Sequence, residues 1–167
     1  VDDITGIAQI ALEARINCHV DACMGGVTLA YLERLGEKIP PWNLQVPGVS
    51  SISVDLHKFG YTSKGASVIM YASKQLRSFQ GFITDNWLGG FYGSSGVLGT
   101  KSGGSMASAW AVMHYLGDDG YMRLTREARE ATLQIASSIR KSNELVLRAE
   151  PQTTLLCFGA CDAKKLN

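Results

Sequence analysis

The chain lacks an excess of charge of either sign, and it lacks a long run of apolar residues. Its 16 Lys and Arg residues nearly balance 15 Asp and Glu residues, which leaves a net charge of +1. Nucleic acids and anionic membranes select basic surfaces, so this balance argues against either as a partner. No apolar run is long enough to cross a bilayer, and no charged segment precedes a short apolar one as in a secretory signal. We therefore expect neither a nucleic-acid partner nor a membrane segment.

The chain also lacks the cysteine spacing of a metal site. Its four cysteines form two loose pairs without C-x-x-C spacing, at Cys18, Cys23, Cys157 and Cys161. No pair of histidines lies at zinc-site distance, so we expect no bound metal. Three of the four lie in strand-like or small-residue contexts, where a free buried thiol is the ordinary interpretation. Reduced cysteines predict a cytoplasmic location.

The motifs of nucleotide-binding proteins and hydrolases are missing as well. The glycine-dense segment 81–104 contains no G-x-G-x-x-G, and Lys101 follows Thr100 where a Walker motif requires glycine. No Ser, His and Asp occur in a recognisable hydrolase motif. These absences argue against a nucleotide-binding domain and against a hydrolase triad.

What the sequence does contain is an alternation of helical and strand-like segments. Helices are predicted over residues 2–14 and 25–36 and twice between 105 and 140, and strands over 16–22, 50–55, 66–72 and 153–160. The strands are continuous apolar runs, which is typical of a mainly parallel sheet covered by helices on both faces. Ligands of such folds bind beyond the carboxyl ends of the strands. Asp21 and the cluster "DLHK" at 55–58 both lie at such ends.

The residues at these strand ends carry a definite chemistry. A lysine amine can form an imine with a cofactor carbonyl, and a carboxylate can keep a basic ring nitrogen protonated. Lys58 and Asp21 supply these groups, and His57 supplies a donor for a phosphate. The alternative is that His57 and Lys58 have no role in a site, because a His-Lys pair is most often part of a solvated loop.

Three separated stretches resemble one enzyme family. They are "HVDACMGG" at 19–26, "PGVSSISVDLHKFGYTSKGASVIMY" at 47–71 and "WLGGFYGSSGVLGTKSGG" at 87–104. In this order they resemble the group II pyridoxal-phosphate decarboxylases and, within that family, the sphingosine-1-phosphate lyases and their bacterial relatives. The resemblance implies pyridoxal 5'-phosphate as cofactor, an α/β type I aminotransferase-like fold, and a homodimer with shared active sites. It also implies that residues 1–150 are part of the large cofactor-binding domain of a longer enzyme and that residues 151–167 begin its small C-terminal domain.

The resemblance implies roles for five residues around the cofactor. Lys58 resembles the Schiff-base lysine, and Asp21 resembles the partner of the pyridine nitrogen. Cys23 stands where the family places a small residue against the ring. His57 resembles the histidine that contacts the phosphate, and Asp55 stands where some relatives have Asn near that phosphate.

The resemblance implies further roles outside this group. Lys64 matches a lysine that the lyases use near the substrate's phosphate, and Tyr61 is a second substrate-binding candidate, although a surface lysine and a packing aromatic remain the alternatives. Gly99 and Thr100 resemble a loop that reaches the partner subunit's cofactor phosphate. Lys101 replaces the arginine usual in this loop and lacks its planar fork.

The implied activity is that of a carbon–carbon lyase, which acts through an external aldimine on a small-molecule amine. A phosphorylated amino alcohol is the favoured substrate, because Lys64 provides a second anion site. The alternative is an L-amino-acid decarboxylase of the tyrosine, glutamate or aspartate type. A non-catalytic protein of the same fold is disfavoured, because Lys58 and Asp21 are both intact.

Overall fold

The computed structural model describes residues 2–162, and these form two compact units. The sheet unit comprises residues 2–26 and 41–113, and the helical unit comprises residues 27–40 and 114–162. The helices are α1 (Ile4–Ala14), α2 (Gly25–Arg34), α3 (Lys74–Ser78) and α4 (Gly103–Arg140). The strands are β1 (Cys18–Asp21), β2 (Val49–Asp55), β3 (Ser67–Tyr71), β4 (Phe82–Thr84), β5 (Tyr92–Ser94), β6 (Leu145–Ala149) and β7 (Cys157–Ala160). All the predicted site residues lie in the sheet unit.

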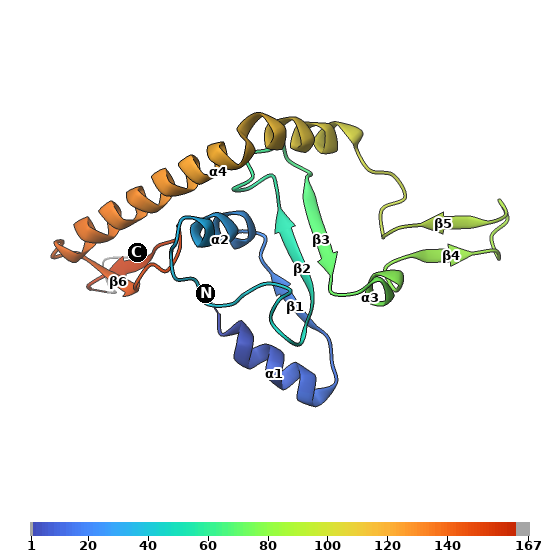
Figure 1. The fold of residues 1–167 in the computed structure, drawn as a ribbon, viewed down its shortest axis with the longest axis horizontal. Coiled ribbons are helices and arrows are strands. Elements are labelled where there is room, and N and C mark those ends of the chain that lie inside the picture. Colours follow the sequence, from blue (N-terminus) through green and yellow to red (C-terminus); the bar gives the residue numbers. More distant parts are fainter. Residues whose placement is uncertain (1, 163–167) are drawn as a thin grey trace. The chain divides into compact units, whose positions relative to one another are not determined.

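A three-stranded sheet in the order β1–β2–β3 forms the centre of the sheet unit (Figure 1). β1 and β2 are parallel, as the sequence predicts, so their carboxyl ends lie at the same edge. β2 and β3 are antiparallel, a pairing that the prediction of a mainly parallel sheet did not specify. The physical reason is the link over residues 56–66, which is shorter than the roughly dozen residues that a parallel crossover needs.

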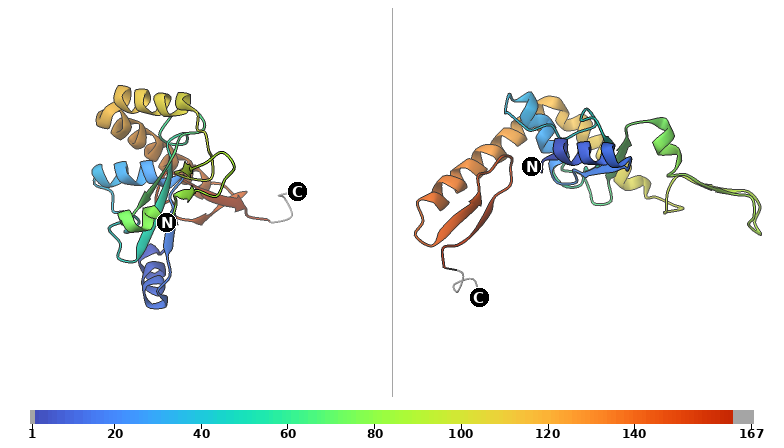
Figure 2. Two further views of the ribbon diagram at one scale, coloured as in Figure 1. Left: turned by 90° about the vertical axis from the view of Figure 1, so that its right-hand side faces the viewer. Right: turned by 90° about the horizontal axis from the view of Figure 1, so that it is seen from below.

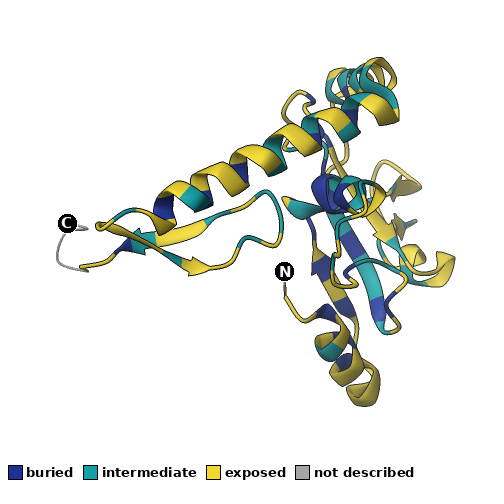
Figure 3. Cartoon of the chain, turned by 60° about the vertical axis from the view of Figure 1, so that its left-hand side comes forward, coloured by how far each residue is buried: buried dark blue, intermediate teal, exposed yellow. Residues whose placement is uncertain are grey.

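The core of this unit gathers on β1, β2 and one face of α1 (Figure 3). The side chain of Asp3 caps α1 by accepting a hydrogen bond from the Gly6 N–H at 3.0 Å. Ile4, Ala8 and Ala11 are the buried residues of this helix, and their spacing places them on one face. The apolar side chains of β1 and β2 therefore pack into the core on one face of the sheet. The polar side chains that alternate with them lie on the opposite face.

Gly26 explains how α2 begins so close to β2. A Cβ atom at this position would lie 2.6 Å from Cγ2 of Val54, closer than real carbon atoms approach. Only glycine permits this contact. The contact holds the turn after Asp21 against the end of the neighbouring strand.

The glycine-dense segment 81–104 contains more regular structure than its composition predicts. β4 and β5 pair as an antiparallel ribbon that follows α3 (Figure 1). The two helices predicted between 105 and 140 are the two parts of α4, which Gly117 divides with a φ of 55°. A left-handed backbone at this position interrupts the helix, and glycine adopts it at low cost.

In the helical unit, β6 and β7 lie beside the C-terminal part of α4 (Figure 2). Arg129 on α4 pairs with the Glu37 carboxylate at 3.0 Å and donates to the carbonyls of Pro151 and Thr153. The predicted domain boundary at residue 151 falls in the link between β6 and β7 and stays a prediction. The last residues of the predicted small domain, 163–167, lie outside the described part of the chain.

The described residues bear on two further expectations. None of the helices within residues 2–162 combines the length and the apolar character needed to cross a membrane.

All four cysteines are free, as expected. Cys18 is buried and Cys23 is half-buried, but Cys157 and Cys161 are exposed because β7 belongs to a two-stranded hairpin. Burial was expected for three of the four cysteines, and this is wrong, because only Cys18 is buried.

Candidate functional site

The candidate site lies at the carboxyl ends of β1 and β2. In the parallel register His19 pairs with Ser51, and Asp21 pairs with Ser53. Side chains two residues apart on a strand point to the same face, so these four polar residues share one face of the sheet. Asp55 ends β2 two residues further along this face.

Asp21 is an exposed carboxylate held in one orientation. Its Oδ1 accepts a hydrogen bond from the Cys23 N–H at 3.0 Å and another from the Ser53 hydroxyl at 3.2 Å. Hydrogen bonds from the Cys23 thiol and backbone lower the pKa of Asp21 below its ordinary value. Asp21 is therefore an anion at neutral pH.

Cys23 follows Asp21 in the turn that leads into α2. The hydrogen bond to Asp21 raises the pKa of the Cys23 thiol, so this sulfur stays protonated at neutral pH. Its Sγ lies 3.5 Å from Oγ of Ser53. The thiol therefore acts here as a small neutral donor and not as a nucleophile.

Lys58 is held by the carboxylate at the end of its own strand. Its Nζ lies 2.8 Å from Oδ2 of Asp55, and 34% of its side chain is exposed. The hydrogen bond to Asp55 raises the pKa of Lys58. Asp55 is buried and also accepts a hydrogen bond from the Ser67 hydroxyl. Hydrogen bonds from Lys58 and Ser67 lower the pKa of Asp55 to about 2. The pair is therefore an ammonium and a carboxylate.

His57 lies near the same oxygen of Asp55 as Lys58 does. Its Nδ1 lies 2.8 Å from the carbonyl oxygen of Ala66, and its Nε2 lies 3.6 Å from Oδ2 of Asp55. A carbonyl can only accept, so Nδ1 carries a proton and donates. The predicted contacts of His57 and Asp55 with a phosphate stay predictions.

The turn after Lys58 carries the two predicted substrate residues, Tyr61 and Lys64, and both are exposed. Tyr61 has a φ of 59°, which is uncommon for a bulky side chain, and its N–H donates to the Lys58 carbonyl at 3.1 Å. The Ser63 N–H and hydroxyl both bond to Oγ of Ser108 on α4. This turn is therefore anchored to a helix and not freely solvated.

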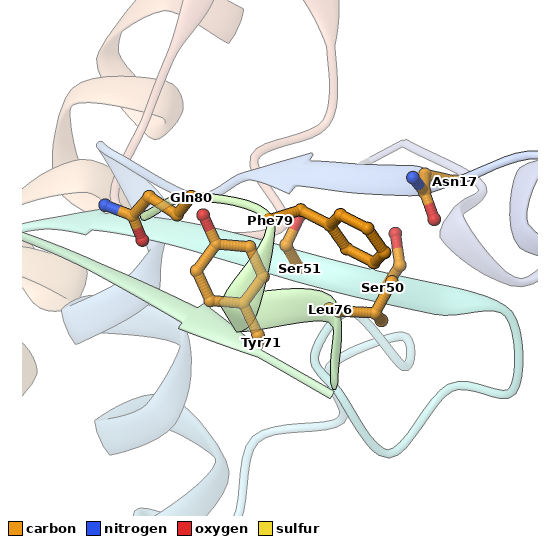
Figure 4. A pocket seen from close by; sticks show the side chains of 7 residues that line it. All are labelled: Asn17, Ser50, Ser51, Tyr71, Leu76, Phe79 and Gln80. Carbon is orange, nitrogen blue, oxygen red and sulfur yellow. The ribbon is translucent and has the colours of Figure 1, made fainter. Parts of the chain in front are cut away.

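Gly99 and Thr100 lie in the exposed link between β5 and α4. Within residues 2–162, no hydrogen bond or ion pair joins them to Asp21 or Lys58. A pocket of about 270 Å³ lies toward the amino ends of β1 and β2, and it shares only Ser51 with the polar face of the site (Figure 4). Asn17, Ser50, Ser51, Tyr71, Leu76, Phe79 and Gln80 line it.

Sequence reasoning did not single out Ser53 and Ser67. Both bond to a carboxylate of the site, Ser53 to Asp21 and Ser67 to Asp55. Ser51, Ser53 and Asp55 alternate with apolar residues, which is a signal for one polar strand face. The strand register that brings Ser53 opposite Asp21 is not visible in that pattern.

Comparisons with known proteins show which family and fold this chain is similar to. The model of one protein family, described as "Pyridoxal-dependent decarboxylase conserved domain", matches residues 1–161. The sphingosine-1-phosphate lyase of Dictyostelium discoideum is 38% identical over 162 residues, which are 97% of this chain and 30% of that protein. An L-aspartate/L-glutamate decarboxylase of Pyrococcus horikoshii is 31% identical over 166 residues, which are 99% of this chain and 43% of that protein.

A solved structure is similar to the whole sheet and helix arrangement. The sphingosine-1-phosphate lyase of Burkholderia pseudomallei superposes with a TM-score of 0.90 at 38% identity, over 96% of this chain and 36% of that one. The type I aminotransferase-like fold is thereby confirmed. The chain spans less than half the length of each of these relatives.

Proposed function

Because the chain belongs to the family of pyridoxal-dependent decarboxylases, we propose that the whole protein is a carbon–carbon lyase that cleaves a phosphorylated amino alcohol. Membership of this family makes pyridoxal phosphate the cofactor. One observation carries the proposal. An exposed carboxylate, Asp21, and an accessible amine, Lys58, lie at the carboxyl ends of two adjacent parallel strands.

The described residues fit this cofactor. A ring nitrogen requires an anion fixed in orientation, and two hydrogen bonds to Oδ1 fix Asp21. An aldehyde requires an amine that solvent-borne molecules can reach, and a third of the Lys58 side chain is exposed. The Nδ1–H of His57 is already bonded to the Ala66 carbonyl, and its Nε2 lies 3.6 Å from Asp55, so His57 is proposed to contact the phosphate through Nε2.

The roles of the residues follow from their chemistry. When bound, pyridoxal phosphate supplies an electron sink for cleavage of a bond at the carbon that bears the substrate's amine. Asp21 holds a proton on the ring nitrogen, which keeps the ring electron-poor. Lys58 would hold the cofactor covalently through its Nζ, which would first have to lose its proton. Asp55 holds Nζ in place, and Cys23 would lie against the ring of the bound cofactor.

Lys64 supports a phosphorylated substrate. It is an exposed cation on the turn that Ser63 and Ser108 anchor to α4, six residues after Lys58. A charge placed on an anchored turn binds a phosphate at less entropic cost than one on a free loop. Tyr61, in the same turn, is proposed to line the substrate site. The relatives named as sphingosine-1-phosphate lyases favour the same substrate class.

A second candidate is an amino-acid decarboxylase, which the similarity to the Pyrococcus enzyme favours. The two activities release different products, so a product assay on the full-length protein separates them. We expect an aldehyde from a phosphorylated amino alcohol and no carbon dioxide from aspartate or glutamate. Carbon dioxide release from an amino acid, without cleavage of the phosphorylated amine, would contradict the lyase proposal.

We also propose a homodimer in which Gly99 and Thr100 reach the partner subunit's cofactor phosphate. Large apolar side chains around β4 and β5 support an interface, because they are exposed in the single chain. They are Phe79, Phe82, Ile83, Trp87, Leu88, Phe91, Val97 and Leu98. The glycine-rich backbone beside them can approach a phosphate closely.

The remaining proposals concern the organisation of the parent protein. Residues 1–150 are proposed to belong to its large domain and residues 151–167 to begin its small domain. The four free cysteines support a reducing compartment, and we propose the cytoplasm.

A further inference from the structure

Hydrogen bonds connect the side chains of Ser51, His19 and Ser53 to Asp21 along the exposed face of β1 and β2. We propose that Ser53 and His19 are positioning residues that set the orientation and charge of the Asp21 carboxylate. The His19 ring holds the Ser53 hydroxyl so that its proton points at Oδ1 of Asp21. The inference rests on the proposed function, because it matters to catalysis only if Asp21 faces the ring nitrogen.

The direction of each hydrogen bond follows from the number of protons available. The Ser53 Oγ carries one proton and lies 3.2 Å from Oδ1 of Asp21 and 3.2 Å from Nε2 of His19. An ionised carboxylate can only accept, so the serine proton goes to Asp21. Nε2 of His19 must therefore carry a proton and donate it to Ser53.

The outer end of this chain of bonds is Ser51. Its Oγ lies 2.8 Å from Nδ1 of His19. In the neutral imidazole only one nitrogen is protonated, so with the proton on Nε2 the other nitrogen accepts from the Ser51 hydroxyl. The complete direction is then Ser51 to His19, His19 to Ser53, and Ser53 to Asp21. Every donor points toward the carboxylate.

Two segments of the chain thus hold one carboxylate oxygen. The Cys23 N–H reaches Oδ1 from the turn after β1, and Ser53 reaches it from β2. Each bond to Oδ1 restrains the rotation of the carboxylate about Cβ–Cγ, and the bond from Ser53 adds a restraint from a second strand to those from Cys23. Neither Ser53 nor His19 needs to touch the cofactor, so both act through Asp21.

The inference is tested on the full-length holoenzyme with a pair of variants at each position. Ser53→Ala removes the hydroxyl, and Ser53→Thr keeps it. His19→Leu removes the ring donor, and His19→Gln places an amide N–H where Nε2 was. Two quantities are measured: the nitrogen NMR signal of the isotopically labelled ring nitrogen, and the rate of amine turnover.

We expect Ser53→Ala to shift the ring-nitrogen signal toward that of the unprotonated ring and to lower kcat by about tenfold, the usual effect of losing one hydrogen bond to a charged group. We expect His19→Leu to act in the same direction. Ser53→Thr and His19→Gln are expected to retain the wild-type signal. His19 is exposed, so its variants test the inference without disturbing the core.

Three results would overturn the inference. The first is a wild-type ring-nitrogen signal in both Ser53→Ala and His19→Leu. The second is equal damage in Ser53→Thr and His19→Gln, which would indicate packing in place of hydrogen bonding. The third is a wild-type protein that binds no pyridoxal phosphate. That result would overturn the proposed function as well, whereas the first two leave it standing.

Discussion

Nζ of Lys58 lies 2.8 Å from Oδ2 of Asp55, so the proposed cofactor-bearing amine is held as an ammonium by a carboxylate of its own turn. The other carboxylate, Asp21, bonds to Cys23 and Ser53. The two strand-end carboxylates therefore have separate partners. Asp55 holds the amine, and we propose that Asp21 serves the ring nitrogen.

This pairing predicts how cofactor attachment depends on pH. Asp55 raises the pKa of Lys58, so the amine stays protonated, and unreactive toward an aldehyde, to higher pH. Asp55→Asn removes that effect and increases the neutral fraction of the amine at a given pH. We expect the rate of covalent attachment, measured on cofactor-stripped full-length protein, to rise at lower pH than in the wild type.

Ser67→Ala is the matched control for this experiment. It removes a hydrogen bond to Asp55 but leaves the charge that faces Lys58. Its profile is expected to stay close to that of the wild type. An unchanged profile in Asp55→Asn would show that the ion pair does not control the amine.

Asp21→Asn tests the carboxylate proposed for the ring nitrogen. A neutral amide cannot hold a proton on that nitrogen, so we expect kcat to fall about a hundredfold or more. Folding and covalent attachment of the cofactor should persist, because Asp21 is exposed. Asp119→Asn, an exposed carboxylate in the helical unit, is the control. Unchanged turnover by Asp21→Asn with a normal cofactor spectrum would remove Asp21 from the mechanism.

Lys64→Met tests the substrate phosphate. A charge-assisted contact to phosphate contributes about 1.5–3 kcal/mol, so kcat/KM for a phosphorylated amine should fall roughly ten- to a hundredfold. Lys64→Arg keeps the charge and should retain most of the activity. Turnover of the same amino alcohol without its phosphate should not change. An equal loss on both substrates would assign Lys64 to the cofactor or to the fold.

Subunit mixing tests the shared site. A Lys58→Ala subunit is combined with a subunit in which Thr100 and Lys101 are both replaced by alanine. If each site combines Lys58 of one subunit with the 99–101 loop of the other, one site of the heterodimer is intact, and each heterodimer has about half the activity of a wild-type dimer. Heterodimers that form but remain inactive would argue against a contact across the interface.

Much of the sheet could be predicted because β1 and β2 carry strong local signals. Each is an apolar run that ends at an aspartate, and their parallel pairing follows from the helix between them. β3 was predicted as a strand but not as antiparallel, because an apolar run has no direction. β4 and β5 were missed because glycine masks their short alternating patterns, and their large side chains are exposed in the single chain.

The sequence predicted where the charged residues of the site lie, but not which residues they hydrogen-bond to. Asp21, Asp55 and Lys58 could be placed at strand ends from the sequence. Which carboxylate holds Lys58 depends on the geometry of the turn over residues 55–58, and the role of Ser53 depends on strand register. Both are tertiary properties, and a linear pattern does not contain them.

The most direct test of the account is to locate the covalently bound cofactor. The full-length protein is loaded with pyridoxal phosphate, reduced with borohydride, digested and analysed by mass spectrometry. We predict one modified peptide, with the cofactor on Lys58, and no modified peptide from the Lys58→Ala variant. Attachment at another lysine, or no attachment in the wild-type protein, would contradict the account.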